Sequence, residues 1–368
     1  MTFKRSSMLA MIAGLVLSAI GCSNGKPTLS RVDVYVGGQD GYHTYRIPAI
    51  VVTVKGTLLA FCEGRKNSVH DYGNIDLLLK RSKNGGLAWS QQIVVHEQGG
   101  DAEITIGNPC PIVDRQGIVH LLFTRNNQRL FHTRSTDDGH TWSKPIEHTG
   151  ILAGFAYPLV RVATGPGHGI QMRSGRLIAP VWVCDRPLPD VNKEPTYARY
   201  QAGVIYSDDR GVTWHAGTLV PPALDRLNEN TVFQRADGSL SMNLRGRKHG
   251  VRVVSESADG GQTWTTPVPD PNLPCPTCQA SILRLSPREV IFSNPASDTR
   301  ANLTIRLSRD DARTWPHSRV LDPGPSGYSD LAVTRDGHIL CLYECGERAY
   351  HQKIAVARFN RAWIMTNP

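Results

Sequence analysis

Arginine residues recur at the ends of short apolar runs in this sequence. Arg65, Arg125 and Arg245 each end such a run, and Arg46 follows Tyr45 in a similar apolar setting. A planar guanidinium group donates two parallel hydrogen bonds to a carboxylate or phosphate. Several arginines brought together on a rigid scaffold therefore predict a binding site for a small anionic group.

The apolar runs themselves form a repeat. A turn, usually with glycine, leads into each run, and every run but 175–182 ends in a polar residue. Six copies cover residues 56–65, 117–125, 175–182, 238–245, 288–294 and 337–344. Their length and their β-branched and aromatic residues are typical of β-strands. No convincing long amphipathic helix accompanies them. Asn294 and Glu344 end the last two runs, as arginines end three others.

A second repeat lies between the runs. It reads Ser-x-Asp/Asn-x-Gly-x-x-Trp and occurs five times, at residues 82–89, 135–142, 207–214, 257–264 and 308–315. The acidic or amide side chain can cap backbone N–H groups, and the glycine permits a positive φ. The tryptophan is expected to pack the turn onto a sheet. Asn84 and Ala88 in the first copy and Ala312 in the fifth depart from the pattern, which affects only the turn.

Repeated units of roughly fifty to sixty residues, each with several short strands, predict an all-β, six-bladed β-propeller with Asp-box turns. We expect a single propeller domain at residues 31–368, whose five Asp boxes close the outer hairpins of blades one to five. Residues near Arg31 to Val36 would supply the outer strand of the sixth blade and close the ring. Because inner strands of a propeller run toward one mouth of its channel, the polar ends of the runs and Arg46 are expected to converge there.

With these motifs the sequence resembles the exo-α-sialidases (neuraminidases) of the bacterial and animal type with Asp-box, or BNR, repeats. The resemblance covers residues 31–362 and rests on specific motifs. They are Tyr-Arg-Ile-Pro at 45–48, Glu-Gly-Arg at 63–65, the Asp boxes, Gly-Asn-Pro-Cys-Pro at 107–111, Gly-Pro-Gly-His-Gly at 165–169, Asn-Glu at 228–229 and Leu-Tyr-Glu at 342–344. It implies retaining hydrolysis of terminal α-linked sialic acid on glycoproteins, gangliosides or oligosaccharides, with no metal or organic cofactor.

The resemblance also implies which residues bind the substrate. Arg46, Arg245 and Arg300 match the arginine triad that binds the sugar's carboxylate, and Glu344 matches the glutamate that supports the first of them. Further positions are expected near the pocket. Arg65 and Arg125 would line the rim of the pocket or its wall near the C4 hydroxyl of the sugar. Asn108 falls where some relatives place an aspartate near the C4 hydroxyl.

The catalytic residues implied by the resemblance are Asp71, Glu229 and Tyr328. Asp71 matches the acid/base aspartate, Tyr328 the nucleophile and Glu229 its base. A tyrosine nucleophile is favoured because the anomeric carbon bears a carboxylate, which would repel an anionic Asp or Glu. A neutral phenol is a weak nucleophile with a pKa of about 10, and therefore needs a neighbouring base. His168 is expected to brace a loop, and a chemical role is the less favoured reading.

The first 21 residues are typical of a signal peptide. Lys4 and Arg5 precede an apolar stretch at residues 8–20 that is too short to span a bilayer. Cys22 at the cut resembles the lipid-modified cysteine of bacterial lipoproteins, so residues 22–30 would form a short tether. We expect an exported lipoprotein anchored to a membrane, periplasmic or at the cell surface. Ordinary secretion with an incidental Cys22 is the alternative.

The remaining composition excludes several classes of protein. A net charge of +9 with no lysine/arginine block argues against nucleic-acid binding and is compatible with an anionic substrate. Seven cysteines follow Cys22, an odd number, so at least one is not paired within the chain. Cys275 and Cys278 have no second Cys/His pair near them, which favours a disulfide or two core thiols over a metal site.

Alternative functions remain open at this point. One is a related hydrolase that prefers the deaminated sugar ketodeoxynononic acid. Another is a non-catalytic, lipid-anchored glycan-binding propeller, since Asp boxes also occur in proteins that hydrolyse nothing. A trans-sialidase is less favoured. We expect a monomer that contacts the membrane only through its lipid.

Overall fold

The computed structural model describes residues 25–186, 199–224, 226–246 and 250–366. The predicted signal peptide at residues 1–21 and the predicted lipidation site Cys22 lie outside these described residues. Within them, no helix has both the length and the apolar character needed to cross a membrane.

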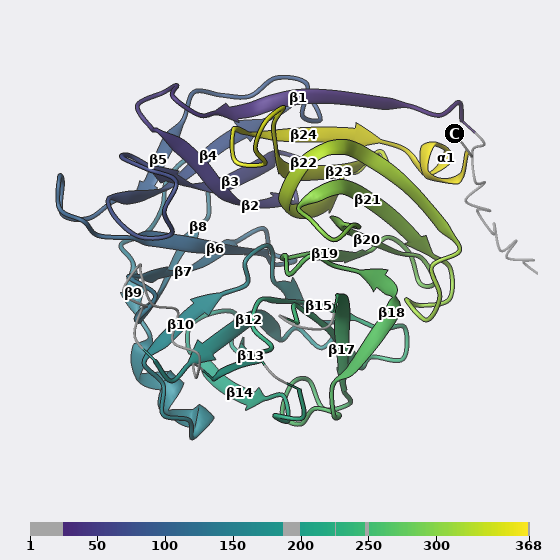
Figure 1. The fold of residues 1–368 in the computed structure, drawn as a ribbon. Helices are drawn as coiled ribbons and strands as arrows, with labels where there is room; N and C mark the ends of the chain where they lie inside the picture. The colour runs from purple at the N-terminus through teal and green to yellow at the C-terminus, as the bar shows by residue number, and fades with distance from the viewer. Residues whose placement is uncertain (1–24, 187–198, 225, 247–249, 367–368) are drawn as a thin grey trace, which may run out of the picture.

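Antiparallel β-strands make up nearly all of the secondary structure, which confirms the all-β prediction (Figure 1). The first sheet contains β2 (Thr44–Val52), β3 (Leu58–Arg65), β4 (Ile75–Ser82) and β5 (Ile93–His96). The second contains β6 (Ile106–Val113), β7 (Val119–Arg125), β8 (Arg129–Ser135) and β9 (Ile146–Glu147). In each of these sheets the strands pair in chain order.

The next two sheets follow the same scheme. The third contains β10 (Arg161–Thr164), β12 (Leu177–Cys184), β13 (Tyr200–Ser207) and β14 (His215–Leu219), and β11 (Ile170–Gln171) also pairs with β12. The fourth contains β15 (Asn230–Gln234), β16 (Leu240–Leu244), β17 (Val251–Ser257) and β18 (Val268–Pro274). The described residues also contain two short helices, the 3-10 helix η1 at Thr149–Phe155 and α1 at Arg361–Met365.

The last sheet has seven strands, so the described residues form five sheets where six separate blades were predicted. Its strands are β19 (Ser281–Arg284), β20 (Val290–Pro295), β21 (Ala301–Ser308), β22 (His317–Val333), β23 (Ile339–Cys345), β24 (Lys353–Phe359) and β1 (Leu29–Val36). The reason is β22, which continues unbroken for 17 residues. It pairs with β21 as far as Pro325 and with β23 from Ser326 onward.

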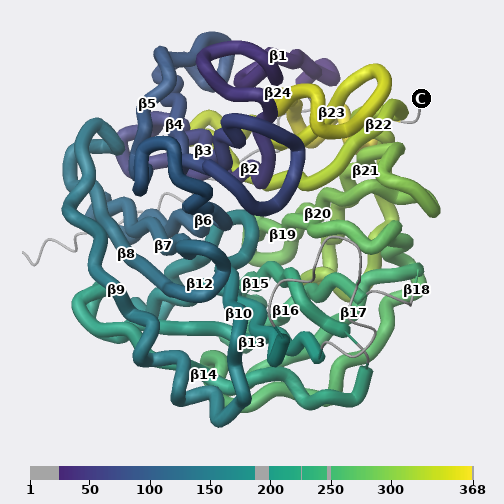
Figure 2. Tube along the Cα trace, turned by 60° about the vertical axis from the view of Figure 1, so that its left-hand side comes forward, coloured from purple at the N-terminus to yellow at the C-terminus, as the bar shows by residue number. Residues whose placement is uncertain are grey.

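The chain closes on itself. The predicted strand near Arg31 to Val36 is present as β1, which pairs with β24 from Leu29 to Val36 (Figure 1). Figure 2 shows the successive sheets following one another around the molecule, from the purple first sheet to the yellow last strands. The first and last strands of the described residues therefore stabilise each other through one set of backbone hydrogen bonds.

The apolar core lies mainly between neighbouring sheets. Phe61 and Leu79 of the first sheet pack against Leu121 and Phe123 of the second. Similar clusters join the second sheet to the third and the third to the fourth, and one cluster joins the last sheet to the first. Each fully buried Leu or Phe side chain contributes about 1.5–3 kcal/mol. Burial between sheets thus fixes the inner strand ends that carry the predicted site.

All five Asp boxes form the same turn, as predicted. They connect β4 to β5, β8 to β9, β13 to β14, β17 to β18 and β21 to β22. In the third box, Ser207 Oγ donates to Asp209 and accepts from Gly211 N, each at 2.8 Å. Asp209 also accepts from Thr213 N at 2.8 Å and Thr213 Oγ1 at 2.6 Å. The hydroxyl bond from Thr213 lowers the pKa of Asp209 to about 2. Ala312 keeps the turn at φ 64° and donates its N–H to Ser308.

The Asp-box carboxylate is expected to stabilise the turn through its hydrogen bonds more than through its charge. Asp209→Ala should lower the free energy of unfolding by about 1 kcal/mol, as for the loss of a capping side chain. Asp209→Asn should lower the free energy of unfolding by only a few tenths of a kcal/mol. The reason is that an asparagine can make the same bond, as Asn84 in the first box accepts from Ala88 N at 2.9 Å. Urea unfolding followed by tryptophan fluorescence measures both. Equal losses in the two variants would show that the charge matters instead.

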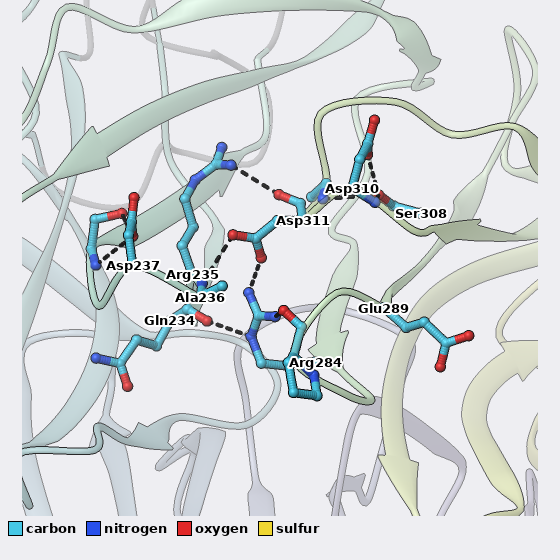
Figure 3. Close-up of polar contacts among 12 residues, drawn as sticks. Gln234, Arg235, Ala236, Asp237, Arg284, Glu289, Ser308, Asp310 and Asp311 are labelled. Atoms are coloured by element: carbon cyan, nitrogen blue, oxygen red, sulfur yellow. Dashed lines mark hydrogen bonds and ion pairs between the residues drawn. The ribbon is translucent and has the colours of Figure 1, made fainter. Parts of the chain in front are cut away.

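The Asp box also binds the neighbouring sheet (Figure 3). In the fifth box, Asp311 forms an ion pair with Arg284 and accepts a hydrogen bond from Ala236 N at 2.9 Å. Its backbone oxygen accepts from Arg235 Nη1 at 2.8 Å. The second box repeats the arrangement, since Asp138 accepts backbone and side-chain bonds from Arg81. These contacts stabilise the order of the sheets far from the predicted site.

Candidate active site

Arg46 is buried on β2 and is oriented by a fully buried carboxylate. Its Nε donates to Glu344 Oε1 at 2.7 Å, and Ile47 N donates to the same oxygen at 3.0 Å. The other oxygen of Glu344 accepts from Tyr328 N at 3.0 Å. Ile47 adopts φ 61° at an irregularity in the β2–β3 pairing, which turns the backbone toward Glu344. Glu344 on β23 therefore aligns β2 and β22 at the point where both carry predicted site residues.

Tyr328, Glu229 and Arg245 form one hydrogen-bonded group. Tyr328 Oη donates to Glu229 Oε1, and Arg245 Nη1 donates both to Glu229 Oε2 and to Tyr328 Oη, the latter at 2.8 Å. Glu229 lies just before β15 and Arg245 just after β16, so the first pair of strands in the fourth sheet brings them together. The sequence separation of Tyr328 and Glu229 is 99 residues.

The phenol of Tyr328 is neutral in this arrangement. Burial and the negative charge of Glu229 raise the pKa of Tyr328 well above its usual value, although Arg245 and Arg300 oppose this. Only 5% of Tyr328 is exposed. A neutral phenol that already donates to a carboxylate can transfer its proton along an existing hydrogen bond. The group can therefore supply a nucleophile together with its base.

Arg300, just before β21, lies beside the same tyrosine. Its guanidinium carbon is 5.2 Å from the ring centroid of Tyr328 and 4.9 Å from that of Tyr350. Arg46 lies 5.4 Å and 5.1 Å from the same two rings. Three positively charged groups from three sheets thus surround Tyr328. This concentration of cations can bind a carboxylate.

Asp71 lies on the loop between β3 and β4. Its carboxylate is 2.9 Å from Arg65 Nη1 and 3.7 Å from Arg46 Nη1, and its side chain is 74% exposed. Reduced hydration in the site raises the pKa of Asp71, but the charges of Arg65 and Arg46 lower it by more, so it lies below the usual value. An exposed carboxylate at the mouth of an arginine-rich site can exchange protons with a bound molecule and with water.

Arg65 and Asn108 lie behind this loop. Arg65 is 2% exposed and binds Glu63 through Nη2 at 2.7 Å. The other oxygen of Glu63 accepts from Asn108 N at 3.0 Å, and the Asn108 side chain donates to Asn127 at 2.9 Å. Asn127 and Asp71 both line a cavity of about 230 Å³. The first two sheets therefore form the wall on the Asp71 side of the site.

Two of the predicted polar strand ends do not join the arginines. Asn294 is fully buried and hydrogen-bonds to Pro274 O and Pro295 O at 2.7 Å and to Arg306 at 3.0 Å. Arg125 pairs along β7 opposite Ile106, and no contact links it to the three arginines in the described part of the chain. The position of a polar residue at the end of a run therefore did not by itself predict that it lies with the arginines, because side chains alternate between the two faces of a strand.

A second buried group lies below the site. Asp330, two residues after Tyr328, accepts hydrogen bonds from Ile50 N and Ser281 Oγ at 2.8 Å and from His168 Nδ1 at 2.7 Å. Burial lowers the pKa of His168, but the charge of Asp330 and its hydrogen bond raise it above the usual value. His168 thus braces the structure, and Asp330 joins segments of three sheets.

Comparison with known proteins identifies the family. The model of the BNR repeat-like domain matches residues 56–341. The chain is 34% identical to a sialidase of Micromonospora viridifaciens over 92% of its own length and 55% of the relative's. It is 32% identical to an exo-alpha-sialidase of Aspergillus fumigatus over 89% of its length and 86% of the relative's. The chain belongs to the BNR-repeat sialidase family. By that membership it is a glycoside hydrolase, an exo-α-sialidase.

Solved structures agree with the family. The Hadza microbial sialidase Hz136 superimposes with a TM-score of 0.77 at 28% identity, covering 90% of this chain and 68% of that one. An intramolecular trans-sialidase from Ruminococcus gnavus superimposes with a TM-score of 0.73 at 18% identity, covering 92% and 98%. The second likeness shows the β-propeller-like fold alone. The chain spans little more than half of the Micromonospora protein, so substrate and residue roles are inferred separately below.

The sialidase site also contains residues that the sequence did not single out. Tyr350 contacts both Arg46 and Arg300, and Glu63 links Arg65 to Asn108. Glu63 stands in the Glu-Gly-Arg motif, so its spacing from Arg65 was a usable signal. Tyr350 had no such signal, because it lies in the turn between β23 and β24.

Cys275 and Cys278 lie under the sialidase site as free thiols. They pack with Ile47 and Tyr328 in one buried cluster. Of the two alternatives left open by the sequence, the structure shows the pair of core thiols. Burial raises the pKa of Cys278 to about 12. In the described part of the chain, no group of three or more His, Cys, Asp or Glu could hold a metal ion.

Proposed function

We propose that this sialidase is a retaining exo-α-sialidase that releases terminal α-linked sialic acid from glycoconjugates, on a six-bladed propeller whose last two blades share β22. The contact that carries the proposal is the hydrogen bond of Tyr328 to Glu229, with Arg46, Arg245 and Arg300 around the ring. This arrangement combines a nucleophile, its base and a binding site for an anion. An anionic sugar with its leaving group beside Asp71 satisfies all three.

The carboxylate of the sugar would bind Arg46, Arg245 and Arg300. Its negative charge would offset part of the positive field that lowers the pKa of Asp71, so binding would raise that pKa. Asp71 would then carry the proton that its role as general acid requires. Of the charges that lower the pKa of Asp71, those of Arg46 and Arg300 would also contact the sugar's carboxylate, whereas Arg65 would not.

In the first chemical step, Asp71 gives its proton to the glycosidic oxygen as the bond from that oxygen to C2 breaks. Tyr328 Oη forms a bond to C2, and Glu229 accepts the phenolic proton. In the second step, Asp71 takes a proton from water, the water oxygen attacks C2, and the bond to Tyr328 breaks. Glu229 returns the proton to the phenolate. Two inversions at C2 give net retention.

Proton NMR of the reaction tests this proposal. Cleavage of a sialyl oligosaccharide by residues 23–368 should release the α anomer of sialic acid first, with the β anomer appearing only by mutarotation. Initial release of the β anomer would contradict a covalent intermediate. If the protein cleaved only the ketodeoxynononic acid glycoside, the proposed substrate would be wrong and the proposed mechanism would stand. Binding without any cleavage would favour the non-catalytic propeller.

The role of Asp71 predicts a dependence on the leaving group. Asp71→Asn should lower kcat/KM for a sialyl oligosaccharide about 10²-fold or more, because its alkoxide needs a proton to leave. The loss should be several-fold smaller for the methylumbelliferyl sialoside, whose phenolate leaves more easily. Since kcat/KM reports only steps up to the first bond cleavage, the later water step does not confuse the comparison.

Asp101→Asn is the matched control, because Asp101 is an exposed acid on the loop before β6. It should change neither value. Equal losses of kcat/KM for the two substrates in Asp71→Asn would contradict protonation of the leaving oxygen by Asp71.

We also propose that the protein is exported and anchored through a lipid on Cys22, as a monomer. The basic, apolar and small-residue pattern of residues 1–22 supports this. Cys22→Ala should move the protein from the membrane fraction to the soluble fraction of the producing cell. An unchanged membrane fraction would contradict the anchor. A molar mass near 40 kDa by light scattering would support the monomer.

A further inference from the structure

The three arginines of the site are not supported in the same way. Arg46 pairs with Glu344, and Arg245 pairs with Glu229. In the described part of the chain, no carboxylate pairs with Arg300. Its contacts are a long hydrogen bond to Thr277 O at 3.4 Å and the rings of Tyr328 and Tyr350. Something other than an ion pair must therefore orient this guanidinium.

The ring of Tyr350 is placed to do so. It lies in the turn after β23, half-buried, with its centroid 4.9 Å from Arg300 and 5.1 Å from Arg46. Gly327 leaves the space for it, since a Cβ on Gly327 would lie 2.8 Å from Tyr350 Cδ2. The glycine directly before Tyr328 thus allows a second ring to reach both cations.

An aromatic ring offers a cation something that a carboxylate cannot. The negative face of the ring attracts and orients the guanidinium but adds no net negative charge. A carboxylate beside Arg300 would also repel an anionic substrate, whereas a ring leaves the full positive charge available to it. Tyr328 offers a ring too, but its oxygen is the one proposed to react. Tyr350 forms no covalent bond in the proposed reaction and can keep its position through both chemical steps.

We propose that Tyr350 is a positioning residue that orients Arg300, and to a lesser extent Arg46, for binding of the substrate carboxylate. This inference rests on the proposed function for its kinetic consequences. Its structural content, the position of the two guanidinium groups, stands independently of activity. It assigns a role to a side chain that belongs to none of the sequence motifs.

Two substitutions separate the ring from the hydroxyl. Tyr350→Leu should raise KM for the methylumbelliferyl sialoside about tenfold, in line with the loss of cation–π contacts in a partly desolvated site. Its kcat should fall by no more than about threefold, because the arginines bind substrate and transition state alike. Tyr350→Phe, which keeps the ring, should stay within about twofold of wild type in both constants.

Tyr206→Leu is the matched control. Tyr206 on β13 stacks on Arg176 at 4.1 Å outside the site, so its loss removes an equivalent contact without touching the substrate arginines. It should leave KM unchanged. An unchanged KM in Tyr350→Leu, or an equal loss in Tyr350→Phe, would overturn the inference.

A crystal structure of Tyr350→Leu tests the positioning directly. Displacement or disorder of the Arg300 guanidinium would support the proposal, and unmoved Arg300 and Arg46 would overturn it. This readout is valid even if the wild type hydrolyses no sialoside. In that case the proposed function would fail, while the structural result would still decide the role of Tyr350.

Discussion

Tyr328→Phe should lower kcat for the methylumbelliferyl sialoside by about 10³-fold or more, with little change in KM. The substitution removes the oxygen that attacks C2 and that donates to Glu229, so the covalent route is lost. The arginines around the ring remain, because the phenyl group still faces Arg46 and Arg300. Substrate binding should therefore persist while chemistry fails.

The control for this prediction is Tyr206→Phe. It removes a phenol hydroxyl from a ring that also stacks on an arginine, but on the third sheet and outside the site. Its kcat should equal that of the wild type. Activity of Tyr328→Phe within about tenfold of wild type would contradict the nucleophile.

A fluorinated sialoside that is cleaved faster than its intermediate is hydrolysed offers a second measurement. Mass spectrometry should find one added sugar on the peptide that contains Tyr328 in the wild type. The same peptide of Tyr328→Phe should remain unmodified. A sugar found on Glu229 would overturn the assignment of nucleophile and base.

Asp330→Ala should lower the free energy of unfolding by about 3–5 kcal/mol, the range for breaking a buried charge pair. The variant would leave buried donors on Ile50, His168 and Ser281 without their acceptor. Unsatisfied buried donors cost free energy because they lose their contacts with water on folding. Urea unfolding at pH 6, followed by circular dichroism, measures the loss.

Asp336→Ala is the matched control for this stability prediction. Asp336 also pairs with a histidine and an arginine, His338 and Arg358, but its side chain is 59% exposed. Its loss should cost less than about 1 kcal/mol, as is usual for surface pairs. Similar losses in the two variants would show that burial does not set the value of these contacts.

The pH dependence gives the Asp330 prediction a second readout. Because the pKa of His168 is raised in the folded state, its pairing with Asp330 contributes fully below about pH 6.5, the usual histidine value. This contribution should decline as pH rises through the raised pKa of His168. Asp330→Ala should lose that part of the slope, and an unchanged slope would contradict the linkage.

Regular spacing explains why much of the fold was predictable. The strand runs and the Asp boxes are local patterns, and local hydrogen bonds such as those of Ser207 and Asp209 form the turns wherever the pattern occurs. The all-β class, the turns between third and fourth strands and the pairing of β1 with β24 followed from them. The merging of two units through β22 did not, because Pro323, Gly324 and Pro325 are typical of a turn, and yet the strand continues through them from its pairing with β21 to its pairing with β23.

The proposed catalytic residues were predicted from the family resemblance of the sequence, without knowledge of their contacts. What the sequence determined by itself was the repeat, the turn chemistry and the number of arginines available. Only the tertiary structure decided which side chains meet: Arg245 but not Arg125, Glu344 but not Asn294, and Tyr350 from an unremarked turn. The physical reason is that strand patterns specify alternation and length, whereas contacts across 99 residues depend on how neighbouring sheets pack.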